Sequence, residues 1–576
     1  MSVVRKLLIA VALASAFVSL ASSAAIGRSS QESVSTSTLM PGVTYSRVVD
    51  FTSRGPIVLD VVTAPKPTGP LYSLAPALSN DFLVGRETLT RLSGRVAGGA
   101  ATVAIDGDYF NRRTGAPAGI LMRNGVLESA PATGRTSLGI DAAGTLTAAR
   151  VSLAGTWQGN GQRRPLLLNG PAGKGKFTLY TPAYGTATPR ESGVVEAVIG
   201  GLPPTRPGVP LAGTVTQVTA AGPTGIPSNG AVLVARGAVS TAQLRAEAPV
   251  GQQVAASLSL SPDWSGLSSA IGGGPLLVRS GKPVFHANES FDPRRLNTRQ
   301  PRGAIGQLAD GRILLVAVEE TNPAYSIGMS SYELAVELSR LGATTAFGLD
   351  AGAAAGIAFN GKLLTQPSGG AEAKLSDALV LTYSGVYVAP PSAPVLSPNG
   401  DGASDTESLT FQVARPSTVV AALAGPNSTT ITLANGTESP GAHTLTWDGV
   451  TPAPEGQWTF TVTATDDRGV TTTAQRTFSL DDTLSSLAVT SGSRPAATFQ
   501  LTRPANVVVR IERLNGVTVA SLGSGQRAAG AQRVSWRGRI GKRQAQRGAY
   551  RVEVVATSSV GTSALAAQFS FRPHPR

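Results

Sequence analysis

Apolar and polar residues alternate along much of the chain, which is the pattern of strands with one buried face. In "TFTVTAT", Phe460, Val462 and Ala464 fall on one face of the strand and the threonines fall on the other. Short continuous apolar runs at 102–105 and 313–318 predict buried strands. We therefore expect a protein built mainly from strands and turns.

One segment has the periodicity of a helix instead. Leucines at 334, 338 and 341 form an apolar stripe, Ser330 and Glu333 form a capping box before it, and Gly342 ends it. A strand at 344–349 follows and places Asp350 at its C-terminal end. Ligand sites commonly lie where strands end, so Asp350 is a candidate site residue.

The C-terminal third contains an internal repeat of about 90 residues. "TFQVARPSTVVAAL" at 410–423 matches "TFQLTRPANVVVRI" at 498–511, and "GAHTLTWDG" at 441–449 matches "GAQRVSWRG" at 530–538. Both copies have alternating strands separated by turns, which is the pattern of a β-sandwich. We therefore expect two all-β sandwich domains at the C-terminal end.

Composition and length agree with this organisation. Only 15% of the 576 residues are charged, whereas glycine (66) and proline (39) are plentiful, which favours turns over long charged helices. "APPSAPV" at 389–395 predicts a proline-rich linker. We expect a large region at 26–388, either one domain or two interleaved lobes, followed by sandwiches at 396–482 and 483–572.

The N-terminal residues 1–25 predict a secretion signal. Arg5 and Lys6 precede an apolar run at 7–21, and small residues near Ala24 and Ala25 offer cleavage points. An uncleaved membrane anchor is the alternative, although the run is short for a membrane span. No later stretch approaches 18 apolar residues, so we expect a secreted or wall-associated mature chain without a transmembrane helix.

Charge is distributed unevenly over the chain, whose net charge is +14. Residues 484–576 hold 14 basic and 2 acidic side chains, whereas 394–483 hold 3 basic and 10 acidic ones. The basic last repeat suits an anionic envelope polymer or surface, and an ordinary solvated face is the alternative. Nucleic acid is not expected, because no aromatic stacking platform accompanies the basic residues.

Two residue types exclude several kinds of chemistry. The chain has no cysteine, so disulfides, thiol catalysis and cysteine zinc sites are impossible. His286 is the only histidine of the large region, which excludes a histidine-rich metal site, and no nucleophile-elbow sequence accompanies it.

A possible calcium site opens the first repeat, in "SPNGDGASDTE" at 397–407. Asn399, Asp401, Asp405 and Glu407 offer oxygen ligands, and the intervening glycines allow a tight wrap. The spacing is not that of an EF-hand, so an acidic turn is the alternative.

Further candidates for chemistry follow buried strands in the large region. Asp106 and Asp108 come directly after the strand at 102–105, where two carboxylates suit acid/base work, metal binding or a capped turn. Gly272, Gly273 and Gly274 precede another strand and would let backbone approach a ligand closely. Arg302 begins a hairpin whose second strand ends at Glu319, and arginine is a natural bidentate partner for phosphate.

Residues from about 101 to 381 resemble the phosphodiester glycosidase domain of the enzyme that uncovers mannose 6-phosphate and of its bacterial relatives. The resemblance rests on the order of nine short elements, "AIDGDYF", "GILMRNGVL", "RTSLGID", "AIGGGPLLVRSGKPV", "PRGAIGQLADGRILLVAVE", "YSIGMSSYELAVELSRLGA", "GLDAG", "FNGKLL" and "LSDALV". The two repeats resemble the Ig-like modules of the flagellar hook-capping protein, with Trp447 or Trp536 in "W-x-G" and a following aromatic strand.

The resemblance implies an α+β domain with a mixed sheet that hydrolyses a sugar-1-phosphodiester at the glycosidic bond. By position, Asp106, Glu319 and Asp350 match acidic or polar positions of the family's elements. The acid and the base or nucleophile would then be a carboxylate pair drawn from Asp106, Asp108, Glu319 and Asp350. The resemblance also implies that Arg302 and the backbone of 272–274 hold the phosphodiester. Because phosphate is a good leaving group, acid catalysis matters less than in other glycosidases.

This chain departs from the family pattern at three places. Asp106 stands where Asn is usual, Gly303 stands where Thr is usual, and "DGGGSS" has become "DAGAAA" at 350–355. An alanine forced to a positive φ would cost roughly 1–2 kcal/mol. Each lost hydrogen bond to a charged phosphate would remove roughly 1.5–3 kcal/mol. The alternatives to an active hydrolase are therefore a sugar-phosphate-binding protein on the same fold and a structural envelope protein.

Overall fold

The structure, a computed structural model, describes residues 31–573 except 221, 286–287, 321, 401, 403 and 451–452. The predicted signal at 1–25, His286 and Asp401 lie outside the described residues. Helices in the described part are short: α1 (Leu89–Val96), α2 (Ala238–Glu247), α3 (Pro293–Asn297), α4 (Ser331–Arg340), with 3-10 turns η1 (Ser79–Asp81) and η2 (Pro426–Ser428). None of these helices has the length and apolar character needed to cross a membrane.

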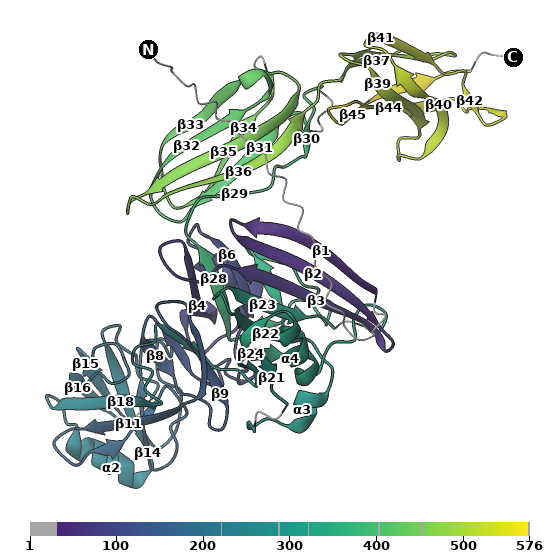
Figure 1. The fold of residues 1–576 in the computed structure, drawn as a ribbon. Coiled ribbons are helices and arrows are strands. Elements are labelled where there is room, and N and C mark those ends of the chain that lie inside the picture. Colours follow the sequence, from purple (N-terminus) through teal and green to yellow (C-terminus); the bar gives the residue numbers. More distant parts are fainter. Residues whose placement is uncertain are drawn as a thin grey trace, which may run out of the picture.

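An eight-stranded antiparallel sheet forms one layer of the large domain (Figure 1). Its strands, in spatial order, are β1 (Gln31–Met40), β2 (Val43–Thr52), β3 (Gly55–Ala64), β23 (Ile313–Val318), β22 (Arg302–Leu308), β24 (Ala343–Ala351), β20 (Leu276–Arg279) and β21 (Lys282–Pro283). The apolar stripe of α4 packs on one face of this sheet, where Leu334 and Leu338 share a core with Val316. The predicted helix, its Ser330–Glu333 capping box and the buried strand at 313–318 are therefore confirmed.

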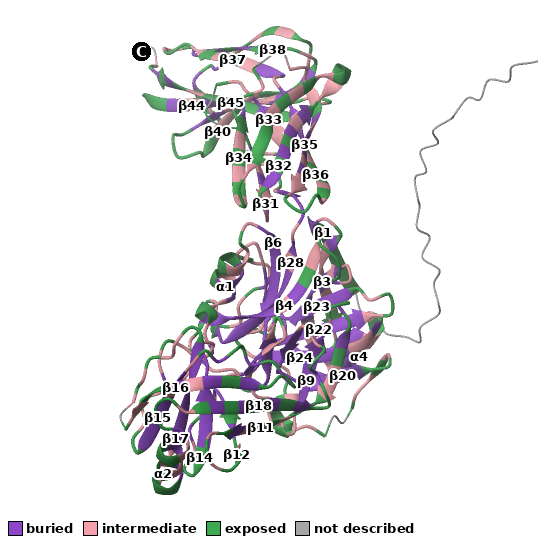
Figure 2. Cartoon of the chain, turned by 90° about the vertical axis from the view of Figure 1, so that its left-hand side faces the viewer, coloured by how far each residue is buried: buried purple, intermediate pink, exposed green. Residues whose placement is uncertain are grey.

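A five-stranded antiparallel sheet packs on the opposite face. Its order is β26 (Lys362–Leu363), β25 (Ile357–Phe359), β6 (Ala101–Asp106), β28 (Asp377–Tyr383) and β4 (Tyr72–Leu78). Val103 and Leu379 from this sheet share a core with Ile305 and Phe347 from the larger one. A small ladder of β5 (Glu87–Thr88) and β27 (Lys374–Leu375) lies beside it, next to α1. Figure 2 shows central strands of the larger sheet, such as β22 and β23, as almost wholly buried.

A second lobe is inserted between the strands of the first. A five-stranded sheet leads into it: β10 (Leu146–Arg150), β9 (Thr136–Ile140), β19 (Ser269–Ile271), β7 (Leu121–Arg123) and β8 (Val126–Ser129). The lobe itself has eight strands: β12 (Arg164–Pro165), β11 (Ser152–Gln158), β18 (Gln253–Ser261), β16 (Leu211–Thr219), β15 (Val194–Gly200), β17 (Gly230–Arg236), β14 (Lys176–Tyr180) and β13 (Leu167–Leu168). Trp157 and Phe177 pack in its separate core, so the large region consists of two lobes.

The expected α+β class is therefore only partly right, because the described chain is mostly β with short helices. The expected mixed sheet is nearly all antiparallel. Within the described part of the large domain, the short pair β13–β14 is the one parallel pair.

Each C-terminal repeat forms two main sheets around a core of its own. The first has β29 (Tyr387–Val388), β31 (Glu407–Val413) and β34 (Gly441–Trp447) facing β30 (Val395–Leu396), β36 (Thr471–Leu480), β35 (Gly456–Asp466), β32 (Ser417–Ala424) and β33 (Thr430–Glu438). The second has β37 (Leu484–Val489), β38 (Ala496–Leu501) and β41 (Gly530–Ser535) facing β40 (Thr518–Arg527), β39 (Ala505–Glu512), β44 (Gly548–Thr557) and β45 (Thr562–Phe571). A ribbon of β42 (Arg539–Ile540) and β43 (Arg543–Gln544) extends the second repeat. Trp447 and Trp536 are buried in the two cores.

The proline-rich segment at 389–395 is attached to the first repeat. β29 lies just before this segment and already pairs with β31. Ser392 then donates from its backbone N–H and its hydroxyl to Glu407 Oε1, at 2.5 and 2.7 Å. In the structure the chain therefore enters the repeat slightly before residue 388.

Candidate active site

Four aspartates from the two packed sheets converge at one end of the core. Asp106 ends β6, Asp108 follows two residues later, Asp350 lies near the end of β24, and Asp377 begins β28. The Asp108 N–H donates to Asp377 Oδ1 at 2.7 Å, and the Asp350 N–H donates to the carbonyl of Gly107 at 2.7 Å. Their exposed fractions are 0 to 8%, so the chain buries four carboxyl groups in one place.

Three of these carboxyl groups are incompletely satisfied. Within the described residues, Asp106, Asp108 and Asp377 each have one buried carboxylate oxygen without a hydrogen-bond partner. The other oxygen accepts a backbone N–H, from Gly356 at 3.0 Å for Asp106 and from Gly119 at 2.5 Å for Asp108. Burial raises the pKa of Asp106 and Asp108 well above the usual value, and neighbouring carboxylates add to the rise.

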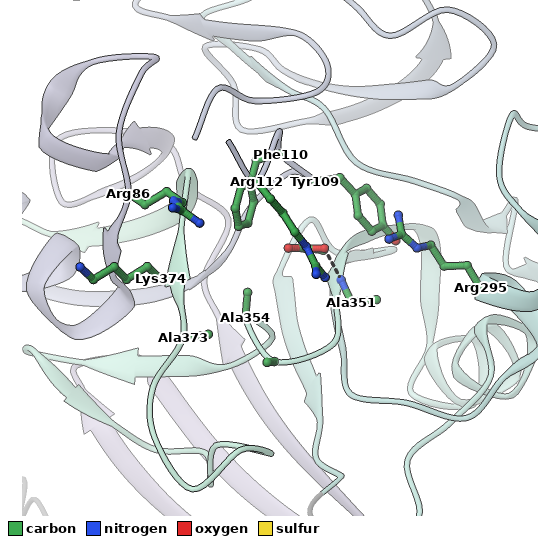
Figure 3. Close-up of a pocket in the computed structure, with 11 residues that line it drawn as sticks. Arg86, Tyr109, Phe110, Arg112, Arg295, Ala351, Ala354, Ala373 and Lys374 are labelled. Carbon is green, nitrogen blue, oxygen red and sulfur yellow. Dashed lines mark hydrogen bonds between the residues drawn. The ribbon is translucent and has the colours of Figure 1, made fainter. Parts of the chain in front are cut away.

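Asp350 differs from these three because it lines a cavity of about 520 Å³. Its Oδ1 accepts the N–H of Ala351 at 2.7 Å (Figure 3). Burial raises the pKa of Asp350 to about 7, although the Ala351 hydrogen bond and the positive charges of Arg295 and Arg112 oppose the rise. A carboxyl group with this pKa can exchange a proton near neutral pH.

Asp350 is the only carboxylate among the residues that line the cavity. Four cations also line it: Arg86, Arg112, Arg295 and Lys374. All four side chains are exposed, and none forms an ion pair within the described part of the chain. Tyr109 supports one of them, because the Arg295 guanidinium lies 5.0 Å from the centre of its ring. The cavity is therefore a positively charged recess with one buried carboxyl group in its wall.

Arg302 does not line this cavity. It is 3% exposed, and it donates to the carbonyls of Met329, Arg295, Leu296 and Thr298 at 2.7 to 3.2 Å. Burial lowers the pKa of its guanidinium to about 10. In the structure Arg302 holds the C-terminal end of α3, the helix that carries Arg295.

The glycines at 272–274 are also packed inside the protein and are absent from the cavity lining. A Cβ on Gly272 would lie 2.2 Å from a carboxylate oxygen of Asp108. The Gly274 N–H donates to the carbonyl of Gly348 at 2.8 Å, which joins this segment to β24. In the structure the close approach that these glycines allow is to Asp108 and β24, and their approach to a ligand stays a prediction.

Glu319 belongs to a separate buried cluster. Its carboxylate accepts hydrogen bonds from Arg47, from Tyr325 and from the N–H of Gln366. Arg47 also donates to Asp60, at 3.1 Å, and burial together with Glu319 raises the pKa of Asp60 to about 8. The structure therefore brings Asp106, Asp108 and Asp350 together and leaves Glu319 out.

The altered loop at 350–355 adopts an unstrained backbone. Gly352 has the positive φ of +98°, whereas the alanines that replace glycines, Ala351 and Ala353, are not among the residues with positive φ. The strain considered for these alanines is therefore absent. Ala353 and Ala354 line the cavity, so a hydroxyl at 354 would have faced its interior.

Within the described residues, the predicted calcium ligands Asp405 and Glu407 bind backbone N–H groups of different segments. Asp405 accepts the N–H groups of Gly400 and Gly402, both at 2.7 Å, and Glu407 is bound by residues 392–393. No group of three or more metal-binding side chains is found within the described residues. The acidic-turn interpretation accounts for Asp405 and Glu407, while Asp401 lies outside the described residues.

Several site residues were not predicted from the sequence. Asp377 lies in "LSDALV", directly before an apolar strand. Asp350 was identified because it directly follows such a strand, so the two signals differ only in the order of aspartate and strand. Arg112, in "DYFNRR", and Arg295, in "FDPRR", lie on loops whose direction only the fold determines. Arg86 and Lys374 reach the cavity because β5 and β27 pair, which no local pattern indicates.

Comparison with family models gives two matches. Residues 208–382 match "Phosphodiester glycosidase", and residues 482–559 match "FlgD Ig-like domain". The first match includes Arg295, Asp350, Lys374 and Asp377 and ends within β28. Asp106, Asp108 and Arg112 lie before it.

Three individual proteins are also similar to this chain. The uncharacterized prophage-derived protein YomE of Bacillus subtilis is 30% identical over 118 residues, which are 20% of this chain and 18% of that protein. A hypothetical protein from Synechocystis has a crystal structure with a TM-score of 0.51 and 27% identity, covering 61% of this chain and 64% of that one. The catalytic domain of zebrafish N-acetylglucosamine-1-phosphodiester alpha-N-acetylglucosaminidase matches at 14% identity over 62% of this chain and 82% of that one, with a TM-score of 0.32.

The chain spans about a fifth of the length of the Bacillus protein and less than two thirds of the Synechocystis one. The family matches agree with the resemblances found in the sequence: the chain carries a phosphodiester glycosidase domain, matched at residues 208–382, and a FlgD Ig-like domain at residues 482–559.

Proposed function

We propose that this protein hydrolyses a sugar-1-phosphodiester at the glycosidic bond, in the cavity beside Asp350. The observation that carries the proposal is the combination of four unpaired cations and one buried carboxyl group around a single recess. A phosphodiester is an anion, so the cations can bind it. A carboxyl group whose pKa is about 7 can accept a proton at neutral pH.

The reaction assigns a role to each part of the recess. Water adds to the anomeric carbon, the bond from this carbon to the phosphate oxygen breaks, and its electron pair leaves with the phosphate. Asp350 accepts the proton that the water loses. Arg112 and Arg295 lie close enough to Asp350 to lower its pKa, so they are placed to hold the phosphate as it gains charge.

The buried aspartates behind Asp350 support it in this role. Ionised Asp350 raises the pKa of Asp106 and of Asp377, so the groups compete for protons. Burial raises the pKa of Asp377 to about 7 as well, but Asp350 is the only one of the four aspartates that lines the cavity. We therefore assign proton transfer to Asp350 and positioning to the other three.

The test is release of reducing sugar from a panel of sugar 1-phosphate alkyl esters by the purified full chain. We expect kcat/KM to rise as the pH increases through about 7, because Asp350 must be ionised to accept a proton. Asp350→Asn should lower kcat/KM by 100-fold or more, about the contribution of a general base. Full activity of Asp350→Asn, or no release from any ester between pH 5 and 9, would refute the proposal.

A second candidate function is binding of sugar phosphates without hydrolysis. It is favoured by the apolar methyl groups of Ala353 and Ala354, which line the cavity where the family motif has a glycine and a serine. Calorimetry would then detect binding of the intact esters although no sugar is released. In that case Ala354→Ser, which restores one hydroxyl to the cavity, should produce measurable release.

We also propose that the protein is exported and that its last domain attaches it to an anionic polymer of the envelope. The support is a set of exposed cations at and around the β42–β43 ribbon, which form no ion pair within the described chain: Arg533, Arg537, Arg539, Lys542, Arg543 and Arg547. Figure 1 shows this ribbon at the far end of the last domain, away from the cavity-bearing domain.

Attachment can be tested with long-chain polyphosphate as the probe. Replacing Arg537, Arg539, Lys542 and Arg543 by glutamine should weaken binding of the full chain and flatten its dependence on salt. The matched control replaces four exposed cations of the inserted lobe by glutamine: Arg163, Lys174, Arg190 and Arg245. Equal losses in both variants would show that net charge alone is responsible.

A further inference from the structure

We infer that the substrate carries a second anionic group, a phosphate or a carboxylate, in addition to the phosphodiester that is cleaved. This inference rests on the proposed function and names the substrate class for the same cavity. The structural basis is that the four lining cations form two pairs on different sides of the recess.

The first pair consists of Arg112 and Arg295. Figure 3 shows these side chains converging from two sides on the region of Ala351, whose N–H donates to Asp350. Both arginines act on the ionisation of Asp350, which places their charges near its carboxylate. One phosphodiester carries a single negative charge, and these two guanidinium groups are sufficient to bind it beside Asp350.

The second pair consists of Arg86 and Lys374. Lys374 lies opposite Thr88 in the β5–β27 ladder, and Arg86 directly precedes β5, so the pairing of these strands brings both residues to the recess. Figure 3 shows both on the side of the cavity away from Arg295, with Phe110 between the two pairs. No acidic partner within the described residues forms an ion pair with either cation.

The balance of charges in the recess favours recognition of a second anionic group on the substrate over a general attraction of anions. The lining contributes four positive charges against one carboxyl group, and the aspartates behind it are buried. A substrate with one negative charge would leave the Arg86–Lys374 pair unneutralised. A glycosyl phosphodiester that bears a further phosphate or carboxylate, as in a chain of sugar phosphate units, would neutralise both pairs.

The experiment compares three esters of the same sugar 1-phosphate: the glycerol ester, the glycerol 3-phosphate ester and the glycerate ester. The first has one anionic group, the second adds a phosphate, and the third adds a carboxylate. We expect kcat/KM for sugar release to be about tenfold higher or more for at least one doubly anionic ester, because a charge-assisted contact is gained. The preferred ester identifies the second group.

The variant Arg86→Gln/Lys374→Gln should abolish this preference, because it should lower kcat/KM for the preferred doubly anionic ester by about tenfold more than kcat/KM for the glycerol ester. Both residues are exposed, so the variant should fold. The control is Arg279→Gln/Lys282→Gln, which removes one arginine and one lysine that are exposed on β20 and β21 and do not line the cavity. This control should retain the full preference.

Three results would overturn the inference: equal kcat/KM for all esters, an unchanged preference in Arg86→Gln/Lys374→Gln, or an equal loss on all esters. The last result would mean that this pair attracts anions without recognising a second group. Absence of sugar release from every ester would refute the proposed hydrolysis instead. Calorimetric binding of the intact esters would then test the preference for a second anion in the same variants.

Discussion

Replacing Asp350 by asparagine should stabilise the protein at neutral and alkaline pH while it removes activity. Asparagine has nearly the same shape but no proton to lose. Burial raises the pKa of Asp350 from 3.8 to about 7. This difference corresponds to about 4 kcal/mol between the protonation states in the folded and unfolded chain.

The sign follows from proton binding. Between pH 3.8 and about 7 the folded chain keeps the Asp350 proton while the unfolded chain has lost it, so stability falls as the pH rises. Above pH 7 the full penalty of about 4 kcal/mol is present. Asp350→Asn lacks this penalty, and it also removes the negative charge that raises the pKa of Asp106 and Asp377. The variant should therefore gain stability over the unmodified protein as the pH rises from 4 to 8.

Pulse proteolysis in urea can measure this difference in the full chain, with the surviving large-domain fragment identified by its mass. The control is Asp310→Asn, because Asp310 lies in an exposed turn where the Arg312 N–H lowers its pKa. This control should gain nothing as the pH rises. The reasoning would be refuted if Asp350→Asn gained less than about 1 kcal/mol over this range, since that would mean Asp350 ionises without a burial penalty.

Three further predictions concern residues around the site. Gly303→Ala should lower the free energy of unfolding by about 1–3 kcal/mol in urea, because its Cβ would lie 2.3 Å from a carboxylate oxygen of Asp106; unchanged stability would contradict this close packing. Arg302→Lys should raise KM for the sugar phosphate esters more than it lowers kcat, because a lysine cannot hold the carbonyls that fix α3 and Arg295; an unchanged KM would show that Arg302 does not position Arg295. Glu319→Gln should keep kcat/KM within about twofold while it changes the stability of the Arg47 cluster, and loss of activity with normal stability would place Glu319 in the active site.

Local sequence patterns predicted the secondary structure well, but they predicted less well which side chains contact one another. The capping box at 330–333 and the apolar run at 313–318 depend on neighbours in sequence, and both appear as expected. Asp106 and Asp350 were identified because each follows a buried strand. The same signal suggested Glu319, but β23 and β24 are separated by β22, and Glu319 meets Arg47 from the N-terminal hairpin instead.

The departures from the family pattern show why single positions were hard to interpret. Asp106 and Gly303 looked like independent changes in the sequence. In the structure they are in contact, and a side chain at 303 would occupy the space of the Asp106 carboxylate. The missing Cβ at 303 therefore accommodates Asp106, and only the packing of β6 against β22 reveals it.

The insertion of one lobe inside the other has a consequence for the order of folding. The Asp108–Asp377 contact joins residues 269 positions apart, and closing a loop of that length costs roughly 5 kcal/mol of chain entropy. In the inserted lobe, β11 pairs with β18 so that Ser152 lies opposite Ser261. If this lobe folds first, it shortens the remaining loop and lowers the closure cost by about 0.5 kcal/mol. The four aspartates can meet only after β28 has been made, so a nascent chain that ends before Asp377 would contain the complete inserted lobe and no active site.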